Sequence, residues 1–464
     1  MKQPVTRKET RSQHPGLMNR GSMLMLATLV VVPNMFFLAV MPLYIAERLI
    51  SPLFYLVAGF LAFFLPPAAA YLVFGAAALA DLGLIVLIAF HLPLATALDS
   101  LRYLSTIDVG SSILYVAIIG IVLATTALTA WLFNRYRASF RSASPLPTAL
   151  AAFAIVATDF FINVPYFVRN EPKFESAIAQ TALLPDAISS RGNNLLIVMV
   201  EGLGAFADPR ERRILSDKLA RIAHGGRYTL ETGVTNYVGS TTGAASRELC
   251  GKWGDYLDYL KGGAVDCLPR QMASRGFDTV AFHGFSHTMF ARDIWYPKIG
   301  FTELNFFEDM VSRNSRDVPS RCGSVFEGLC DAEVGDLVGA RLKAEAERPK
   351  LVYWLTLNTH IPYVAAPHGS LECRAPGAAI GNSTVCELTE LWGEIFDKVA
   401  EIAADPSLRA TGILVVGDHH TPLWERSAKK RFTLGKVDWY LLRSNESRPQ
   451  QIVATRFSQA PLRP

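Results

Sequence analysis

Long apolar runs are concentrated between residues 21 and 166 of this chain. A helix needs about 20 mostly apolar residues to cross the hydrocarbon core of a bilayer. Five segments approach or reach that length, near residues 22–43, 52–67, 70–92, 112–133 and 147–166. We therefore expect an α-helical membrane anchor of about five spans over residues 21–166, preceded by a tail at residues 1–20. Pro66 and Pro67 separate the second and third spans, as a turn or as a kink.

Positive charge in short loops predicts how these spans are oriented. Basic residues gather in the tail and between the fourth and fifth spans, at Lys2, Arg7, Lys8, Arg11, Arg20, Arg135, Arg137 and Arg141. With five spans both regions lie on one side, which we assign to the cytoplasm. Everything after residue 166 is then outside, as in a multi-pass protein of a bacterial inner membrane with a periplasmic domain.

Two acidic residues, Asp81 and Asp159, fall inside predicted spans. Carboxylates within a membrane are costly and often functional. We favour a structural interpretation for both. Asp159 is expected near the outer interface, and Asp81 is expected to face a helix partner or water.

The cysteines all lie in the C-terminal half and form three pairs with short gaps along the chain. They are Cys250 and Cys267, Cys322 and Cys330, and Cys373 and Cys386. Closely spaced pairs in an exported domain are typical of local disulfides, so we expect these three bonds. The alternatives are free thiols or a zinc cluster, although no CxxC spacing supports zinc.

The rest of the chain has the pattern of an α/β domain. Residues 167–192 are polar and mixed, which indicates a linker along the membrane surface. Short apolar runs then predict strands at 195–200, 278–283, 351–357, 412–417 and 437–442, with helical stretches between them, including 209–223 and 385–404. This alternation predicts a central, mostly parallel sheet in a domain spanning residues 193–464. No basic stripe interleaved with aromatics indicates nucleic-acid binding.

Acidic and imidazole side chains follow four of the predicted strands. Glu201 follows the first, His283 closes the second, His360 comes shortly after the third, and Asp418 and His419 follow the fourth. Ligands of parallel sheets bind at the carboxyl ends of the strands. Carboxylate and imidazole ligands suit Mn²⁺, Mg²⁺ or Zn²⁺. The pattern therefore predicts a site for a divalent metal.

The segment GSTTGAASRELCG, residues 239–251, offers a nucleophile. It follows a strand-like stretch and continues into good helix formers, so the hydroxyl of Thr241 would meet a helix N-terminus that favours anions. A neighbouring cation would lower the pKa of that hydroxyl further. The alternative is a simple helix cap, since Ser240, Thr241 and Thr242 are all suitable capping residues.

Residues 195–445 resemble the alkaline phosphatase and sulfatase superfamily, and within it the lipoteichoic acid synthase and phosphoglycerol transferase branch. The resemblance rests on four motifs, VMVEGLG, GSTTGAASRELCG, FHGFSHTMFARDIWYPKIGF and GDHHTPL. In the second motif a threonine stands ten residues before a glycine, which selects Thr241 over Thr242. The five-span anchor fits the same architecture.

The resemblance implies a role for each matching position. Glu201, Thr241, Asp418 and His419 would hold one divalent metal ion, Mn²⁺ or Zn²⁺, with Mg²⁺ as a third option. His283, Phe290 and Arg292 would line the pocket for the transferred head group. His360 would contact the phosphate or protonate the leaving group. Phe290 departs from the tryptophan that is common in the synthases.

The implied reaction transfers phosphoglycerol from phosphatidylglycerol to an envelope glycan or lipid-linked acceptor through a phosphothreonine. Phosphoethanolamine transfer to lipid A or a glycan is the alternative within the class. A sulfatase is less favoured, because Thr241 lacks a CxPxR-type context. From a different class, the chain could be a non-catalytic scaffold or binding protein of the envelope.

Overall fold

The structure is a computed structural model that describes residues 19–45, 48, 50–89, 92–166, 173–313, 319–345, 347–366 and 369–445. Most of the predicted basic tail and residues 167–172 of the predicted linker lie outside the described residues. The chain divides into two compact units. The first comprises residues 1–101, 108–170 and 422–430, and the second comprises residues 102–107, 171–421 and 431–464.

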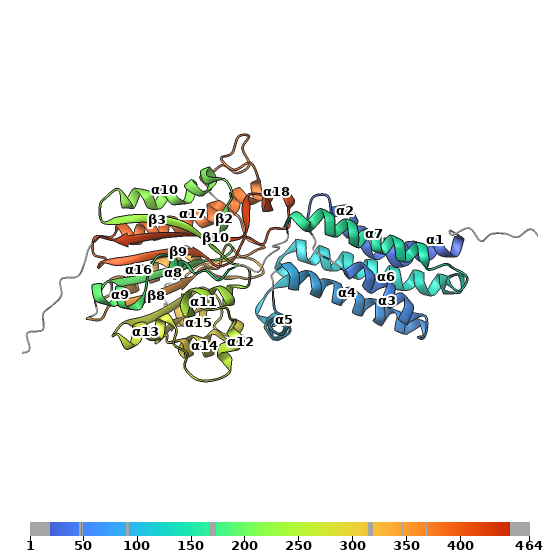
Figure 1. Cartoon of the computed structure of the whole chain (residues 1–464), viewed down its shortest axis with the longest axis horizontal. Helices are drawn as coiled ribbons and strands as arrows, with labels where there is room; N and C mark the ends of the chain where they lie inside the picture. Colours follow the sequence, from blue (N-terminus) through green and yellow to red (C-terminus); the bar gives the residue numbers. More distant parts are fainter. Residues whose placement is uncertain are drawn as a thin grey trace, which may run out of the picture. The chain divides into compact units, whose positions relative to one another are not determined.

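The first unit is helical (Figure 1). Its first helical stretch joins α1 (Arg20–Leu26), a π-helical turn (Ala27–Val31) and α2 (Val32–Val40), and the others include α3 (Ser51–Ala62), α4 (Pro67–Ala89), α5 (Leu94–Ser100), α6 (Ile113–Phe140) and α7 (Leu146–Asn163). Within the described residues, four helices are long and apolar enough to cross a membrane, at 20–40, 67–88, 113–140 and 146–166. The second predicted span is a shorter apolar helix, α3, which ends ahead of Pro66.

Asp81 in α4 is buried and paired with Arg48, which lies between α2 and α3. Arg48 Nε donates to Asp81 Oδ1 at 3.0 Å, and the Tyr55 hydroxyl donates to Asp81 Oδ2 at 3.2 Å. Arg48 also donates to Asn34 Oδ1 at 2.6 Å. A buried charge needs such partners, and these contacts favour the structural interpretation of Asp81.

The second unit is built on an eight-stranded sheet in the order β2-β10-β9-β1-β8-β4-β5, with β3 paired to β10. Its strands are β1 (Asn194–Val200), β2 (Gly204–Phe206), β3 (Tyr228–Asn236), β4 (Asp278–His283), β5 (Glu303–Asn305), β8 (Lys350–Leu355), β9 (Thr411–Gly417) and β10 (Phe432–Ser444). Neighbours from β9 to β5 are parallel, whereas β10 is antiparallel to β9, β2 and β3. The predicted mostly parallel sheet is confirmed.

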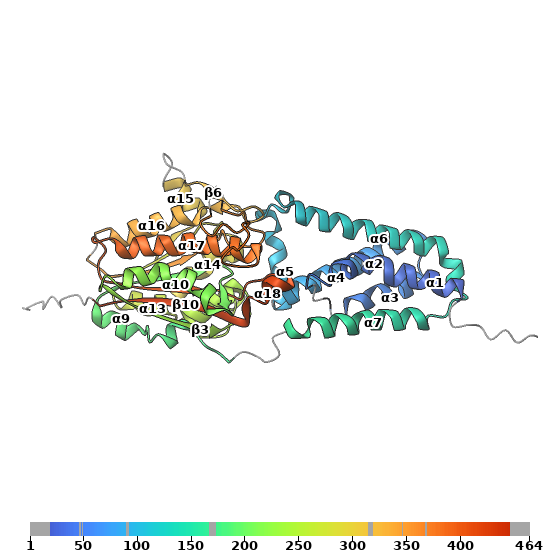
Figure 2. The ribbon, with the colours of Figure 1, turned by 90° about the horizontal axis from the view of Figure 1, so that it is seen from above.

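Helices cover both faces of this sheet. Helices α10 (Pro209–Ala223), α16 (Asp331–Lys343) and α17 (Ser383–Ala404) lie together on one face, as Figure 2 shows from above. On the other face, α11 (Thr241–Cys250), α13 (Leu268–Ser274) and α14 (Arg292–Ile299) pack against Leu195, Ile197 and Met199 of β1. Every residue of β1 is buried, which explains its continuous apolar run.

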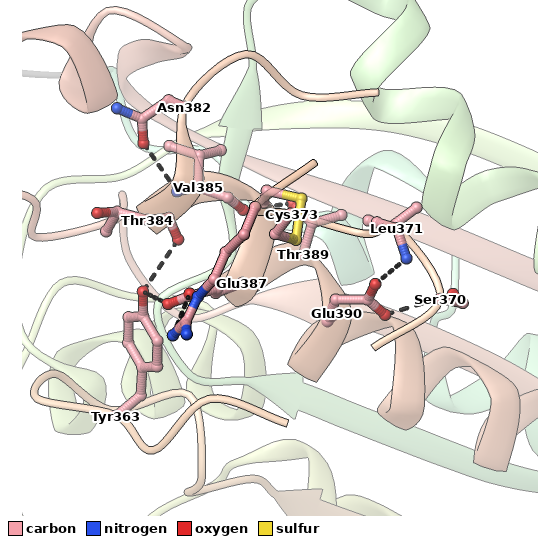
Figure 3. Close-up of a disulfide and its surroundings, with 12 residues drawn as sticks. Tyr363, Ser370, Leu371, Cys373, Asn382, Thr384, Val385, Glu387, Thr389 and Glu390 are labelled. Carbon is pink, nitrogen blue, oxygen red and sulfur yellow. Dashed lines mark hydrogen bonds and ion pairs between the residues drawn. A yellow bond between two sulfur atoms is a disulfide. The ribbon is translucent and has the colours of Figure 1, made fainter. Parts of the chain in front are cut away.

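Disulfides join the six cysteines in the three predicted pairs. The first joins the end of α11 to the residue before α13, and the second closes a two-stranded ribbon of β6 (Arg321–Cys322) and β7 (Gly328–Leu329). The third, Cys373–Cys386, attaches the loop after β8 to the first turn of α17 (Figure 3). The Tyr363 hydroxyl of that loop donates to Glu387 at 3.2 Å, so covalent and polar contacts hold the loop on the helix.

Candidate active site

Two adjacent parallel strands bring together the predicted carboxylates and imidazole. In the β1–β9 pair, Val200 is in register with Gly417, so Glu201 and the Asp418-His419 pair leave the sheet side by side. Glu201, Asp418 and His419 are buried, and their ligand atoms lie within 4.8 Å of one another. His419 Nε2 is 3.3 Å from Glu201 Oε1 and 3.4 Å from Asp418 Oδ2. This arrangement suits a divalent cation.

The hydrogen bonds of Asp418 and His419 leave one atom of each side chain, Asp418 Oδ2 and His419 Nε2, in a position to bind a cation. Asp418 Oδ1 accepts from the Gly202 and His419 amides at 2.7 and 2.6 Å, whereas its buried Oδ2 has no hydrogen-bond partner among the described residues. His419 Nδ1 donates to the His420 carbonyl at 3.0 Å, which turns Nε2 toward the carboxylates. His419 Nε2, 3.4 Å from Asp418 Oδ2, pairs with this oxygen electrostatically, and a cation would satisfy that oxygen more fully.

The electrostatics of the site also favour a cation. Burial raises the pKa of Asp418, and repulsion from Glu201 raises it further. Burial opposes the charged form of His419, yet the carboxylates of Asp418 and Glu201 outweigh burial and raise its pKa. A proton on His419 therefore balances the carboxylates when no cation is bound. A metal ion bound by His419 would displace that proton, since a ligating imidazole is neutral.

Thr241 is the first residue of α11 and faces the same carboxylates. Its hydroxyl donates to Glu201 Oε2 at 3.3 Å. The N-cap of the helix is Ser240, whose Oγ accepts from the Gly243 amide at 3.2 Å. The capping role that was an alternative for Thr241 is thus performed by its neighbour, and Thr242 is buried with its Oγ1 3.1 Å from Ser240 Oγ. Thr241 is left directed at the carboxylates, at a helix N-terminus.

His283 and Arg292 are the buried polar pair of the predicted head-group site. His283 closes β4, and its Nδ1 donates to the Leu355 carbonyl at 3.0 Å. Burial and the nearby charge of Arg292 lower the pKa of His283 to about 3, so the imidazole is neutral. Arg292 is 3% exposed and donates to the Met289 carbonyl at 3.2 Å, but its Nε has no partner among the described residues. A buried guanidinium with a free donor suits a phosphate.

Phe290 and Ala291 precede Arg292 in a strained turn. Their φ angles are 56° and 50°, a region that non-glycine residues seldom occupy and that concentrates at functional sites. The Phe290 ring contacts Tyr256 and Tyr103, with centroids 5.4 and 5.6 Å apart. Tyr103 lies in a 3-10 helix (Leu101–Thr106) between α5 and α6, and nothing in the sequence pattern had singled it out.

His360 lies outside the three-residue ligand set but acts on it. When protonated, His360 would lower the pKa of Glu201 against the effect of burial. Burial lowers the pKa of His360 itself, with Glu201 opposing. Its Nδ1 donates to the Ile361 carbonyl at 2.9 Å, so Nε2 is an acceptor, and its ring lies 3.9 Å from that of Phe326.

Three further side chains hold the backbone of Glu201. The Thr356 hydroxyl accepts from the Glu201 amide at 3.0 Å. The Thr359 hydroxyl and the Trp392 indole donate to its carbonyl at 2.6 and 3.2 Å. Sequence reasoning had missed all three, because only the fold brings Trp392 of α17 to the end of β1.

Residues 194–374 match the Sulfatase family model. The matched part of the second unit is thus similar to the Sulfatase family, in agreement with the resemblance of the first three motifs to the alkaline phosphatase and sulfatase superfamily. The fourth motif, GDHHTPL, lies beyond the matched residues. No match to the chain was found among curated proteins.

Three solved structures are among those that are similar to parts of this chain. The lipoteichoic acid synthase LtaP from Listeria monocytogenes is 17% identical, with 56% of this chain and 67% of that chain covered and a TM-score of 0.40. The phosphoglycerol transferase GacH from Streptococcus pyogenes, in complex with sn-glycerol-1-phosphate, is 14% identical, with 59% and 76% covered and a TM-score of 0.39. The C-terminal periplasmic domain of EcEptC from Escherichia coli, in complex with Zn, is 14% identical, with 55% and 73% covered and a TM-score of 0.38.

Proposed function

We propose that this chain is a membrane-anchored, metal-dependent transferase that moves the phosphorylated head group of a phospholipid to an envelope acceptor. The observation that carries the proposal is the position of Thr241. Its hydroxyl lies 3.3 Å from Glu201 Oε2, beside a buried set of two carboxylates and an imidazole that suits a cation. The four long apolar helices support an anchor in the membrane that contains the lipid donor.

Glu201, Asp418, His419 and Thr241 would hold the ion, for which the ligand types favour Mn²⁺ or Zn²⁺. A bound divalent cation supplies Lewis acidity and lowers the pKa of a neighbouring hydroxyl. Arg292 and the neutral His283 imidazole would bind phosphoryl oxygens of the donor. The first amides of α11 add positive potential where Thr241 becomes an anion.

In the first half-reaction the Thr241 oxygen attacks the phosphorus of the lipid, and the bond from phosphorus to the diacylglycerol oxygen breaks. His360 Nε2 accepts the proton that Thr241 releases and returns it to the diacylglycerol oxygen. In the second half-reaction an acceptor hydroxyl attacks the phosphorus of the phosphothreonine and gives its proton to His360 Nε2. The bond from phosphorus to the Thr241 oxygen breaks, and His360 returns the proton to that oxygen.

Within this class we favour phosphoglycerol transfer over phosphoethanolamine transfer. Arg292 lies 5.4 Å from the centroid of the Phe290 ring, and Arg102 lies 4.8 Å from that of Tyr103. The head-group site therefore combines aromatic surface with positive charge. The positive charge of the two arginines would repel the primary ammonium of an ethanolamine head group but not a neutral glycerol. With the shorter helix α3 counted as the fifth span, the distribution of basic loops would place the site in the periplasm, where a glycan or lipid-linked acceptor would be met.

The test is to incubate the purified full-length protein in Mn²⁺ with labelled phosphatidylglycerol or phosphatidylethanolamine, and to measure diacylglycerol release. We expect faster release from phosphatidylglycerol. Preference for phosphatidylethanolamine would support the alternative head group. Release from neither lipid would contradict the transferase and favour a non-catalytic envelope role.

A further inference from the structure

Arg247 joins the helix that carries Thr241 to the strand that carries the metal carboxylate. It lies in the second turn of α11 and is fully buried. Its Nη2 donates to the Gly417 carbonyl at 2.9 Å, and its Nη1 donates to the Asp418 carbonyl at 3.2 Å. The guanidinium also lies 4.3 Å from the centroid of the Tyr237 ring. One side chain therefore connects α11 to the end of β9.

The charge of Arg247 is balanced by Glu248, which is equally buried. Arg247 Nε donates to Glu248 Oε1 at 2.7 Å. The Glu248 carboxylate also accepts hydrogen bonds from the Ser176 hydroxyl and from the Ala177 and Ile178 amides, at 3.0, 3.1 and 3.0 Å. A buried ion pair is stable only when its other donors and acceptors are satisfied in this way. The residues that satisfy Glu248 come from the linker that follows α7 in the chain.

We propose that Arg247 is a positioning residue for the metal centre, and that Glu248 and the linker hold it in place. Arg247 fixes the backbone of Asp418 at a set distance from the first turn of α11, and hence from Thr241. Residues that orient metal ligands without touching the ion change metal affinity by about 10–100-fold when they are replaced. The inference rests on the metal site of the proposed function and concerns binding rather than transfer.

The test compares Arg247→Lys with Arg227→Lys in the full-length protein. Lysine keeps the positive charge but lacks the planar fork that reaches two carbonyls and Glu248 at once. Arg227 is a matched control, because it also donates to two backbone carbonyls, those of Asp405 and Leu408. The readouts are the Kd for Mn²⁺ from titration calorimetry and the melting temperature in chelator.

We expect both variants to melt at a lower temperature, but only Arg247→Lys to weaken Mn²⁺ binding, by at least about tenfold. Equal Mn²⁺ affinity in Arg247→Lys and the wild type would overturn the inference while leaving the proposed function intact. If Arg247→Lys does not fold, Glu248→Gln takes its place with the same expectation and the same contradicting result. Absence of Mn²⁺ binding by the wild-type protein would overturn the proposed function and this inference together.

Discussion

The hydroxyl of Thr241 and Oε2 of Glu201 lie 3.3 Å apart, although 40 residues separate them in the chain. Glu201 is placed by the end of β1, and Thr241 is placed by the start of α11, whose cap is Ser240. The positions of Glu201 and Thr241 are therefore fixed by two different secondary-structure elements. If Thr241 is the nucleophile, as we propose, its place beside a buried carboxylate would require little rearrangement before it reacts.

Removing the Thr241 hydroxyl should abolish transfer without unfolding the protein. We expect Thr241→Ala to lower head-group release by at least about 10³-fold, because loss of a nucleophile removes the covalent route. Thr242→Ser is the control, since it keeps a hydroxyl at the next position and should retain most activity. Comparable activity in Thr241→Ala and the wild type would rule out the phosphothreonine.

Mn²⁺ affinity should rise with pH. The raised pKa of His419, to which its carboxylate neighbours contribute, means that the imidazole is protonated in the metal-free protein at neutral pH. Binding must release that proton, so affinity should increase by up to about tenfold per pH unit. Titration calorimetry in two buffers of different ionisation enthalpy measures the released proton. A Kd that does not change between pH 6 and 8 would contradict the assignment of His419 as a ligand.

His283 should make the fold less stable in acid. Its pKa is lowered to about 3 by burial and by Arg292, whereas an unfolded histidine titrates near 6.5. Between these values the unfolded chain binds the extra proton, so this contribution to stability is complete above about pH 6.5 and is lost as the pH falls toward 3, by about 1.4 kcal/mol per pH unit.

His283→Asn keeps a donor for the Leu355 carbonyl and removes the titration. We therefore expect its melting temperature to fall less steeply than that of the wild type between pH 6.5 and 4. His224→Asn, at an exposed histidine after α10, is the control and should follow the wild-type profile. Parallel profiles for His283→Asn and the wild type would show that His283 is not buried in its neutral form.

The Cys250–Cys267 disulfide should stabilise the sheet face that carries α11. It connects the end of that helix to the start of α13, and loss of a native disulfide typically costs about 2–5 kcal/mol. We expect Cys250→Ser/Cys267→Ser to lower the free energy of unfolding by this amount in denaturant titration. Unchanged unfolding, or thiols of the wild type that label without reductant, would contradict the bond.

The strand pattern predicted the site residues that lie next to strand ends, whereas Thr241, Phe290 and Arg292 were predicted from helix-start motifs and the family resemblance. The runs before Glu201 and Asp418 are continuous and apolar because both faces of β1 and β9 are covered, and parallel strands bring their carboxyl ends together. The pairing of the cysteines followed from short separations along the chain. In each case a local pattern determined the three-dimensional neighbour.

Other features depend on packing that no local pattern encodes. Tyr103, which contacts Phe290, lies in the segment between α5 and α6. Trp392 donates a hydrogen bond to Glu201, although the two residues are 191 positions apart in the chain. Residues 422–430 group with the first unit, although they lie within the predicted soluble domain. Arg426 illustrates this, since it donates to Asn163 of α7 at 2.7 Å. Such contacts depend on how distant segments pack in the folded chain, and the spacing of residues in the sequence does not reveal this packing.

The most direct test is mass spectrometry of the peptide that contains Thr241, after the full-length protein has reacted with phosphatidylglycerol in Mn²⁺ without an acceptor. The account predicts a glycerophosphoryl group on Thr241 that appears with diacylglycerol and disappears when acceptor is added. Diacylglycerol release with an unmodified Thr241, or with the group on another residue, would contradict it.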